Sequence, residues 1–217
     1  GAIVHYRASA GADRELASDD LLLLDSGGHY RDGTTDITRT ISIGTPPKGA
    51  VAAYSHVLQS HIHLAMAKFP AGTNGKQLDA IARAPLWAAG LDFAHGTGHG
   101  VGHVLSVHEG PASISKRGEV ALEAGMVLSN EPGFYQTGDW GIRIENLIVV
   151  TPAKQTGFLE FETITLCPLD RRLIDKTLLN ASEIDWVDRY HRAVYRQLHP
   201  HLSPITKSWL ETVCRRL

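Results

Sequence analysis

The sequence predicts a protein of the α+β class. Runs of apolar and β-branched residues, bounded by Gly, Pro and Asp, predict strands within 21–43, 126–150 and 158–168. Apolar residues at helical spacing predict helices between and after these strands. Glycine occupies every second position from His95 to Gly102, which disfavours a helix and favours an extended segment whose backbone is closely approached by something else.

The first strands carry two acidic residues. A short strand is predicted at 2–8, and the apolar run 21–24 predicts a second strand that ends at Asp25. A loop and the turn signal at 30–33 follow, and the β-branched stretch 34–43 predicts a third strand with Asp36 inside it. The two carboxylates are therefore expected beside apolar strands.

Two further strands are predicted at 126–130 and 141–150, joined through a Pro-Gly turn and a loop at Gly138. Strict alternation along 141–150 places Arg143 and Glu145 on one face. A last strand is predicted at 158–168.

Four helices are expected. The first begins at Thr45-Pro-Pro and continues to Phe69, with histidines 56, 61 and 63 at a surface or interface. The second follows the polar loop 70–75, contains Pro85 as a kink and stops at Gly90. The third starts with a capping-box pattern at 182–185, and the last carries the apolar residues between Trp209 and Leu217.

Composition excludes several functions. The formal net charge of −2 over 217 residues and the lack of basic runs exclude a nucleic-acid surface. No apolar run is long enough to span a bilayer, so no membrane partner is expected. Cys167 and Cys214 lack metal or disulfide-scaffold spacing and predict free thiols in a reducing, cytoplasmic compartment. The chain begins at Gly1 without Met and runs directly into a strand-like stretch, which indicates a fragment of a longer protein.

Four carboxylates and one imidazole lie in or beside apolar, strand-like segments, where a charge is costly unless it is paired or binds a metal. Nearby Lys and Arg are too few to pair them all. This oxygen-rich set suits hard or borderline ions, and two divalent cations would neutralise the four carboxylates. The predicted ligands of a two-metal site are Asp25, Asp36, His99, Glu131 and Glu145.

Six motifs together resemble the pita-bread metallopeptidase family, and most nearly its three-domain, cytosolic-type Xaa-Pro aminopeptidases. The motifs are Asp-Ser-Gly at 25–27, Asp-Ile-Thr-Arg-Thr at 36–40, His-Gly-Thr-Gly-His-Gly-Val-Gly at 95–102, Val-His-Glu-Gly-Pro at 107–111, Glu-Pro-Gly at 131–133 and Gly-Ile-Arg-Ile-Glu-Asn at 141–146.

The resemblance implies a fold and a domain division. A curved, mostly antiparallel sheet with covering helices is expected, lacking its N-terminal portion. Residues 1–168 would form an N-terminally incomplete catalytic domain and residues 169–217 its C-terminal helical extension. In the family, two non-catalytic domains precede the catalytic domain.

The resemblance also implies roles. Asp25 would bind one metal, His99 and Glu131 the other, and Asp36 and Glu145 both. Glu131 would also be the general base for the incoming water, and Arg143 would orient Glu145. His5 and His108 would contact the substrate and the tetrahedral intermediate, and His95 would line the proline pocket. His103 is expected to have a packing or surface role.

The expected reaction is hydrolysis of the bond between an N-terminal residue and a following proline by a metal-bridging hydroxide. The metal is expected to be Mn²⁺, with Co²⁺, Zn²⁺ or Mg²⁺ as alternatives, and the protein a homodimer acting on peptides with proline at the second position. The alternatives are a prolidase restricted to dipeptides, a metal-free pseudoenzyme that is a binding module on the same fold, and a two-metal phosphoesterase.

Overall fold

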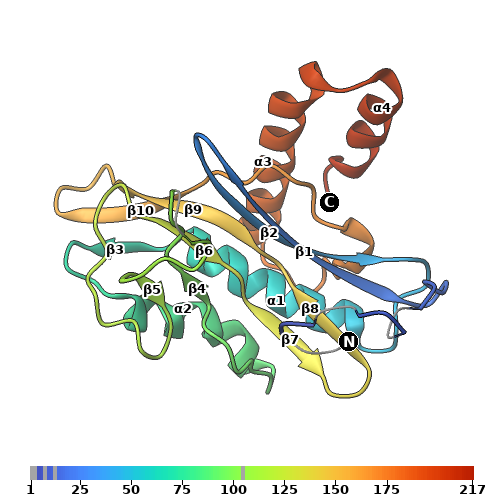
Figure 1. Cartoon of the computed structure of the whole chain (residues 1–217), viewed down its shortest axis with the longest axis horizontal. Helices are drawn as coiled ribbons and strands as arrows, with labels where there is room; N and C mark the ends of the chain where they lie inside the picture. The colour runs from blue at the N-terminus through green and yellow to red at the C-terminus, as the bar shows by residue number, and fades with distance from the viewer. Residues whose placement is uncertain (1–3, 7–8, 12–13, 104–105) are drawn as a thin grey trace.

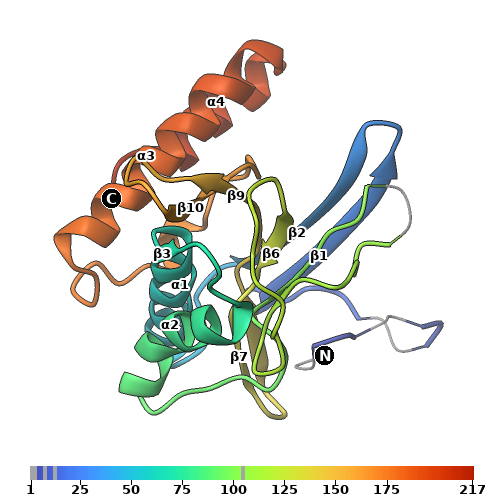
Figure 2. The ribbon, with the colours of Figure 1, turned by 90° about the vertical axis from the view of Figure 1, so that its left-hand side faces the viewer.

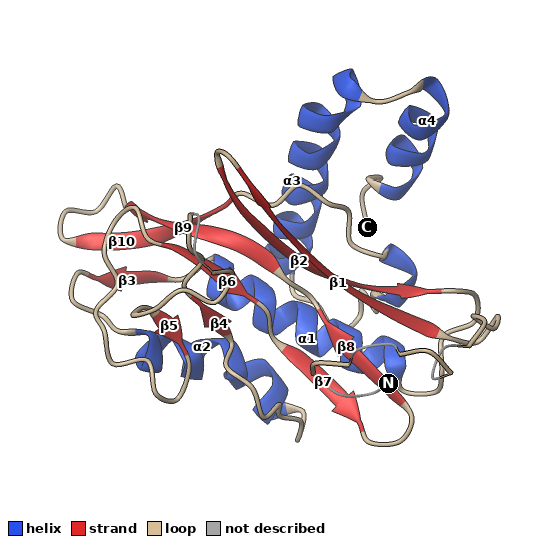
Figure 3. Ribbon diagram, in the orientation of Figure 1, coloured by secondary structure: helices blue, strands red, loops and turns tan. Residues whose placement is uncertain are grey.

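The computed structural model describes residues 4–6, 9–11, 14–103 and 106–217. The strands lie mostly in the first three quarters of this part of the chain, and two helices end it (Figures 1 and 3). The helices are α1 (Ala50–Ala65), α2 (Gly75–Ala88), α3 (Ala181–Leu198) and α4 (Pro204–Val213). The strands are β1 (Leu21–Tyr30), β2 (Gly33–Ser42), β3 (Lys68–Pro70), β4 (Gly98–His99), β5 (Ser113–Ile114), β6 (Val127–Asn130), β7 (Gly133–Gln136), β8 (Trp140–Arg143), β9 (Asn146–Pro152) and β10 (Phe158–Thr163).

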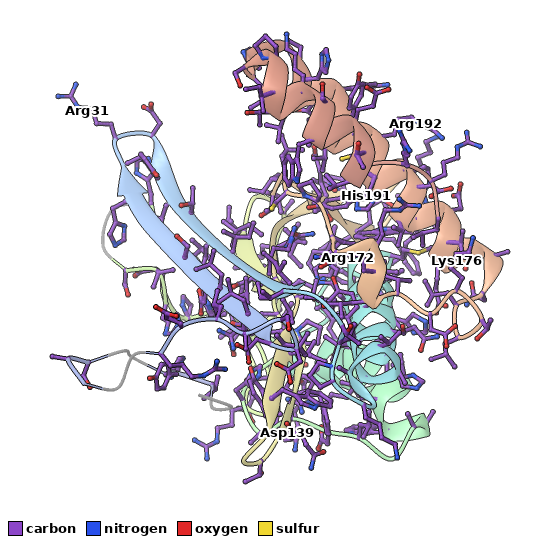
Figure 4. All side chains as sticks on the ribbon, turned by 90° about the vertical axis from the view of Figure 1, so that its right-hand side faces the viewer. Arg31, Asp139, Arg172, Lys176, His191 and Arg192 are labelled. Carbon is purple, nitrogen blue, oxygen red and sulfur yellow. The ribbon has the colours of Figure 1, made fainter. Side chains whose placement is uncertain are left out.

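Strands β1 and β2 form one long antiparallel hairpin. Leu21 lies opposite Ser42 and Tyr30 opposite Gly33, so the turn lies at Arg31 and Asp32. Figure 4 shows Arg31 at the tip, away from the rest of the molecule. The predicted loop after residue 25 is wrong, because the Ser-Gly-Gly sequence stays extended and keeps its pairing with β2. Residue 25 therefore lies in the middle of β1 and not at its end.

The central sheet has the strand order β3-β10-β9-β6, and all its pairs are antiparallel. Strands β7 and β8 lie between β6 and β9 in the chain and form a separate antiparallel hairpin, in which Gly133 lies opposite Arg143. The single strand predicted at 141–150 is wrong, because β8 ends at Arg143 and β9 begins at Asn146. At the break, the Glu145 N–H bonds the Thr38 carbonyl of β2 at 3.1 Å. After Arg143 the backbone therefore leaves the β7–β8 pair and hydrogen-bonds to β2.

Helices α1 and α2 pack on one side of the strands, and the β1–β2 hairpin reaches out on the other side (Figure 2). Tyr54, Leu58 and Ile62 of α1 are fully buried in the larger core, as the predicted apolar stripe requires. Helix α1 begins at Ala50 after Gly49, whose φ is 82°, and not at the predicted Thr45-Pro-Pro. His61 is completely buried, so its predicted surface position is wrong.

The second helix follows the polar loop and ends before Gly90, as predicted. Asn74 caps α2 in a capping box with Gln77, and Gly90 adopts a φ of 73° just after the helix. Pro85 lies inside the last turn of the helix.

The C-terminal part is helical but its boundaries differ from those predicted. The capping box of α3 uses Asn180 and Glu183, because the Asn180 carboxamide accepts from two backbone N–H groups, and does not begin at the predicted residue 182. Helix α4 ends at Val213, before the predicted Leu217. The strand predicted at 158–168 ends at Thr163.

The strand predicted at 2–8 lies partly outside the described residues, and residues 4–6 form no strand, so that prediction is wrong where it can be compared. Both cysteines are free thiols. Within the described residues, no helix combines the length and the apolar character needed to cross a bilayer.

Candidate metal centre

Five side chains on or directly beside strands meet where the β1–β2 hairpin lies against the other strands. Asp25 comes from β1, Asp36 from β2 and His99 from β4, while Glu131 follows β6 and Glu145 lies between β8 and β9. Ligand atoms lie within 4.8 Å of one another in three overlapping groups: Asp36, His99 and His108; His99, Glu131 and Glu145; and Asp25, Asp36 and Glu145. The structure thus brings together all five predicted metal ligands.

The Gly-rich segment fits against its neighbour as predicted. A Cβ on Gly98 would lie 2.0 Å from the Ser129 carbonyl oxygen, and one on Gly100 would lie 2.2 Å from the Glu109 carbonyl oxygen. Glycine is therefore required at both positions on either side of His99. The His99 backbone N–H also bonds the Ser129 hydroxyl at 3.0 Å.

The His99 ring is oriented by its own main chain. Its Nδ1–H donates to the Gly100 carbonyl at 2.9 Å, which turns Nε2 toward Asp36 Oδ2 at 3.4 Å and Glu131 Oε1 at 3.3 Å. Burial by itself lowers the pKa of His99, but the two carboxylates and the bond to Gly100 overcome it and raise that pKa to about 9. Nε2 is thus presented to the carboxylates, as a metal-binding imidazole requires.

The ionised forms of Glu131 and Glu145 are disfavoured by their surroundings. Burial raises the pKa of Glu131 although the positive charge of His99 acts against it. Burial, and then repulsion by Glu131 and Asp36, raises the pKa of Glu145. Carboxylates crowded in this way cannot all ionise without more positive charge than the site's own side chains supply.

Arg143 connects three site residues. Its Nη2 bonds Asp25 Oδ2 at 2.6 Å, and its Nε donates to the Thr38 hydroxyl at 3.1 Å. That hydroxyl in turn donates to Glu145 Oε2 at 2.6 Å. The predicted link between Arg143 and Glu145 therefore runs through Thr38, which the sequence did not single out.

His95 is held as a neutral ring. Its Nδ1 donates to the Gly96 carbonyl at 2.8 Å, and its Nε2 lies 3.0 Å from the Tyr135 hydroxyl, which accepts from Arg143 Nη1 at 2.7 Å. Burial lowers the pKa of His95 to about 4. Sequence reasoning missed Tyr135, and the only signal was its position four residues after Glu131.

His5 and His108, the two histidines predicted to contact substrate, lie at the solvent-exposed side of the site. The ring centroid of His108 lies 4.1 Å from that of His99 and 6.3 Å from that of His5. His108 and His5 are exposed, so both can reach a ligand from solvent. His103 is also exposed, as expected, and its backbone carbonyl accepts a hydrogen bond from the Thr34 hydroxyl of the hairpin at 3.2 Å.

The donor set fits two divalent cations. Four carboxylates and one imidazole nitrogen provide the hard, oxygen-rich ligands that Mn²⁺, Mg²⁺ or Co²⁺ prefer. Arg143 Nη2 lies 2.6 Å from Asp25 Oδ2 and so pairs closely with that carboxylate. The Glu131 carboxylate is farther away, with Oε2 3.9 Å from Arg143 Nε. Two dications would supply the missing charge.

Comparison with known proteins identifies the class. Residues 1–152 match metallopeptidase family M24 and residues 157–217 match the C-terminal region of peptidase M24. The chain belongs to metallopeptidase family M24, with the pita-bread fold that the motifs predict.

Individual relatives are similar over the full chain. A probable Xaa-Pro aminopeptidase P of Laccaria bicolor is 45% identical over 228 residues, which cover 100% of this chain and 36% of that protein. The crystal structure of X-prolyl aminopeptidase from Caenorhabditis elegans, a cytosolic enzyme with a di-nuclear active site, matches with a TM-score of 0.94 at 44% identity over 100% of this chain and 37% of that one. The chain thus spans little more than a third of the length of each of these two relatives.

Prolidases match less completely. The prolidase from Thermococcus sibiricus matches with a TM-score of 0.67 at 31% identity, over 80% of this chain and 44% of that one. The fold is shared, but the C. elegans aminopeptidase matches the whole of this chain and the prolidase does not.

Proposed function

We propose that this chain carries the two-metal centre of an Xaa-Pro aminopeptidase, which removes an N-terminal residue that precedes proline. The observation that carries the proposal is the convergence of four carboxylates and the His99 Nε2 atom in overlapping groups within 4.8 Å. The C. elegans X-prolyl aminopeptidase, 44% identical over the whole chain, has a di-nuclear site and supports the same reaction class.

The ligand set divides by position. Asp25 would hold one metal, His99 and Glu131 the other, and Asp36 and Glu145 would contact both. Two bound cations would act as Lewis acids on the scissile carbonyl and would lower the pKa of water. We propose Mn²⁺ as the metal, because the ligands are mostly oxygen.

The remaining residues prepare the site. Glu131 is proposed as the general base for the incoming water, because its carboxylate lies within the cluster, 3.3 Å from His99 Nε2. Arg143 holds Asp25 directly and Glu145 through Thr38. Exposed His5 and His108 are proposed to donate to the substrate carbonyl oxygen, where charge develops in the transition state. Neutral His95, beside Phe93 at a centroid distance of 4.8 Å, would line the proline pocket.

The broader setting is proposed on similar grounds. We propose that residues 1–168 form the catalytic domain and 169–217 its helical extension; separate family matches to 1–152 and 157–217 support a division of the chain into these two parts. A cytosolic location is supported by the C. elegans relative. A homodimer is supported by the exposed apolar side chains Ile205 and Trp209 on α4.

The test is an assay of the full-length protein loaded with Mn²⁺. A tripeptide beginning Xaa-Pro should be cleaved at least about 100-fold more efficiently than the same peptide with alanine in place of proline. A chelator should abolish cleavage, and added Mn²⁺ should restore it. Equal cleavage without proline would contradict the proposal, cleavage of Xaa-Pro dipeptides alone would indicate a prolidase, and no bound metal would indicate a pseudoenzyme.

A further inference from the structure

Arg39 is a buried cation outside the metal-binding set. It is 5% exposed, and the ion pairs found in the described part of the chain do not include it. Its N–H groups donate to neutral oxygens, namely the carbonyls of Pro168, Thr38, Glu145 and Cys167, the Asn146 carboxamide and the Tyr190 hydroxyl. Burying a charge without a counter-ion is costly, and here hydrogen bonds to neutral oxygens are what offset that cost.

The contacts of Arg39 lie at the break in the chain that carries Glu145. Because β8 ends at Arg143 and β9 begins at Asn146, the Glu145 carbonyl has no ladder partner. Arg39 Nη1 donates to that carbonyl at 2.6 Å. Arg39 Nη2 bonds the Asn146 carboxamide oxygen at 2.8 Å. One guanidinium therefore holds the main chain and the next side chain beside a proposed metal ligand.

The other side of Asn146 is also held. Its amide nitrogen lies 3.1 Å from His61 Nε2, and His61 Nδ1 donates to the Asn130 carbonyl at 3.1 Å. Asn130 lies opposite Asn146 in the β6–β9 pair, so the residues that follow and precede them, Glu131 and Glu145, are neighbours. The same buried contacts thus fix the backbone at both glutamates.

Tyr190 brings the C-terminal region into this cluster. Its hydroxyl accepts from Arg39 Nη2 at 2.9 Å and from the Cys167 N–H at 3.3 Å. The hydroxyl proton has the Cys167 carbonyl, at 2.9 Å, as its nearest acceptor. The ring is stacked on Trp186, with centroids 5.2 Å apart and planes 8° apart. Helix α3 therefore orients the guanidinium that holds Glu145.

We propose that Arg39 and Tyr190 are positioning residues for the metal centre, and that the C-terminal helical region completes it. Tyr190 fixes the Arg39 guanidinium, and Arg39 fixes the backbone of Glu145 and the side chain of Asn146. The inference rests on the proposed two-metal function. Residues that orient metal ligands from behind contribute to metal affinity although they do not touch the metal.

The test is Tyr190→Phe in the full-length protein, with Mn²⁺ binding measured by calorimetry below the melting range. Loss of one hydroxyl should raise the Mn²⁺ dissociation constant about 10-fold. The matched control is Tyr195→Phe, which removes the same atom from the same helix, where the hydroxyl has no hydrogen-bond partner among the described residues. Its Mn²⁺ affinity should equal that of the parent.

Each remaining outcome is decisive. Unchanged Mn²⁺ affinity in Tyr190→Phe, even with a lower melting temperature, would show a structural role only and would overturn the inference. If that variant does not fold, Arg39→Lys, which keeps the charge but not the fork of N–H donors, should lower Mn²⁺ affinity, and parental affinity there would overturn it. A parent protein that binds no Mn²⁺ would refute the metal centre itself.

Discussion

The Thr38 hydroxyl connects the Arg143 guanidinium to the Glu145 carboxylate by two hydrogen bonds. It accepts from Arg143 Nε at 3.1 Å and donates to Glu145 Oε2 at 2.6 Å, and the residue is fully buried. One hydroxyl has one proton and can accept as well, so both bonds coexist. The orientation of Glu145 therefore depends on an uncharged side chain.

Thr38→Val should weaken Mn²⁺ binding between about 10- and 100-fold, because the nearly isosteric methyl group leaves Glu145 Oε2 and Arg143 Nε without their partner. Thr38→Ser keeps the hydroxyl and should bind Mn²⁺ like the parent. Calorimetric titration of both variants provides the comparison. Equal affinities for valine and serine would mean that the hydroxyl does not orient Glu145.

At the residue scale, sequence reasoning works where the cost of a charge is visible locally. Asp25, Asp36 and Glu145 stand out because each interrupts or follows an apolar run. Thr38 and Tyr190 do not, because a neutral hydroxyl in such a run is ordinary. Their partners lie 107 and 151 residues away along the chain, so only the folded structure reveals the contacts.

At the element scale, helix α2 supports the segment that carries His95. Arg83, 1% exposed, donates to Asp79 Oδ2 at 2.8 Å and to the carbonyls of Phe93 and His95 at 2.6 and 2.7 Å. The other Asp79 oxygen accepts from the Thr97 hydroxyl at 2.5 Å. The guanidinium also lies 3.9 Å from the Phe93 ring centroid. One buried ion pair thus ties a helix to the Gly-rich strand.

Arg83→Met should therefore lower the free energy of unfolding by about 3–5 kcal/mol, because it leaves the Asp79 charge buried without its partner. The control is Arg189→Met, which breaks the exposed Asp185–Arg189 pair at the same helical spacing and should cost at most about 0.5 kcal/mol. Urea unfolding measures both variants. Similar losses in the two would contradict the assigned role of the buried pair.

Element boundaries were predicted less well than element types. The Ser-Gly-Gly sequence after Asp25 was taken as a loop, yet it stays in β1 because β2 pairs with it over its whole length. The break at Glu145 was missed because Ile142, Ile144 and the apolar run 147–150 on either side of it are typical of a strand. In both places tertiary pairing overrides local preference, and a single sequence does not display it.

At the scale of the whole molecule, the fold brings four carboxylates together, and their negative charge exceeds what the nearby side chains neutralise. Removing metal should therefore make stability depend on pH. Burial, and for Glu145 also repulsion by Glu131 and Asp36, raises the pKa of both glutamates above their ordinary value. Asp36 and Glu131 raise the pKa of His99 to about 9 against the effect of burial. Burial lowers the pKa of His61 to about 3 and that of His191, which is labelled in Figure 4, to about 4.

These directions fix the sign of the dependence. A group whose pKa is higher in the folded state binds a proton on folding, so its contribution is present at low pH and is lost as pH rises through the folded pKa. For Glu131 and Glu145 this loss begins above the ordinary Glu pKa of 4.5, and for His99 it begins above 6.5 and extends to about 9. His61 and His191 act in the opposite sense but only below pH 6.5, where the unfolded chain gains protons.

The metal-free protein should therefore lose stability as pH rises from about 6.5 to about 9, by up to about 1.4 kcal/mol per pH unit for each group that titrates. The Mn²⁺-loaded protein should lose less, because bound cations favour the ionised carboxylates. Urea unfolding with a chelator or with Mn²⁺ across this range measures the difference, and Glu145→Gln should flatten the slope of the metal-free protein. A metal-free protein that keeps or gains stability over the range would contradict the charge balance inferred for the site.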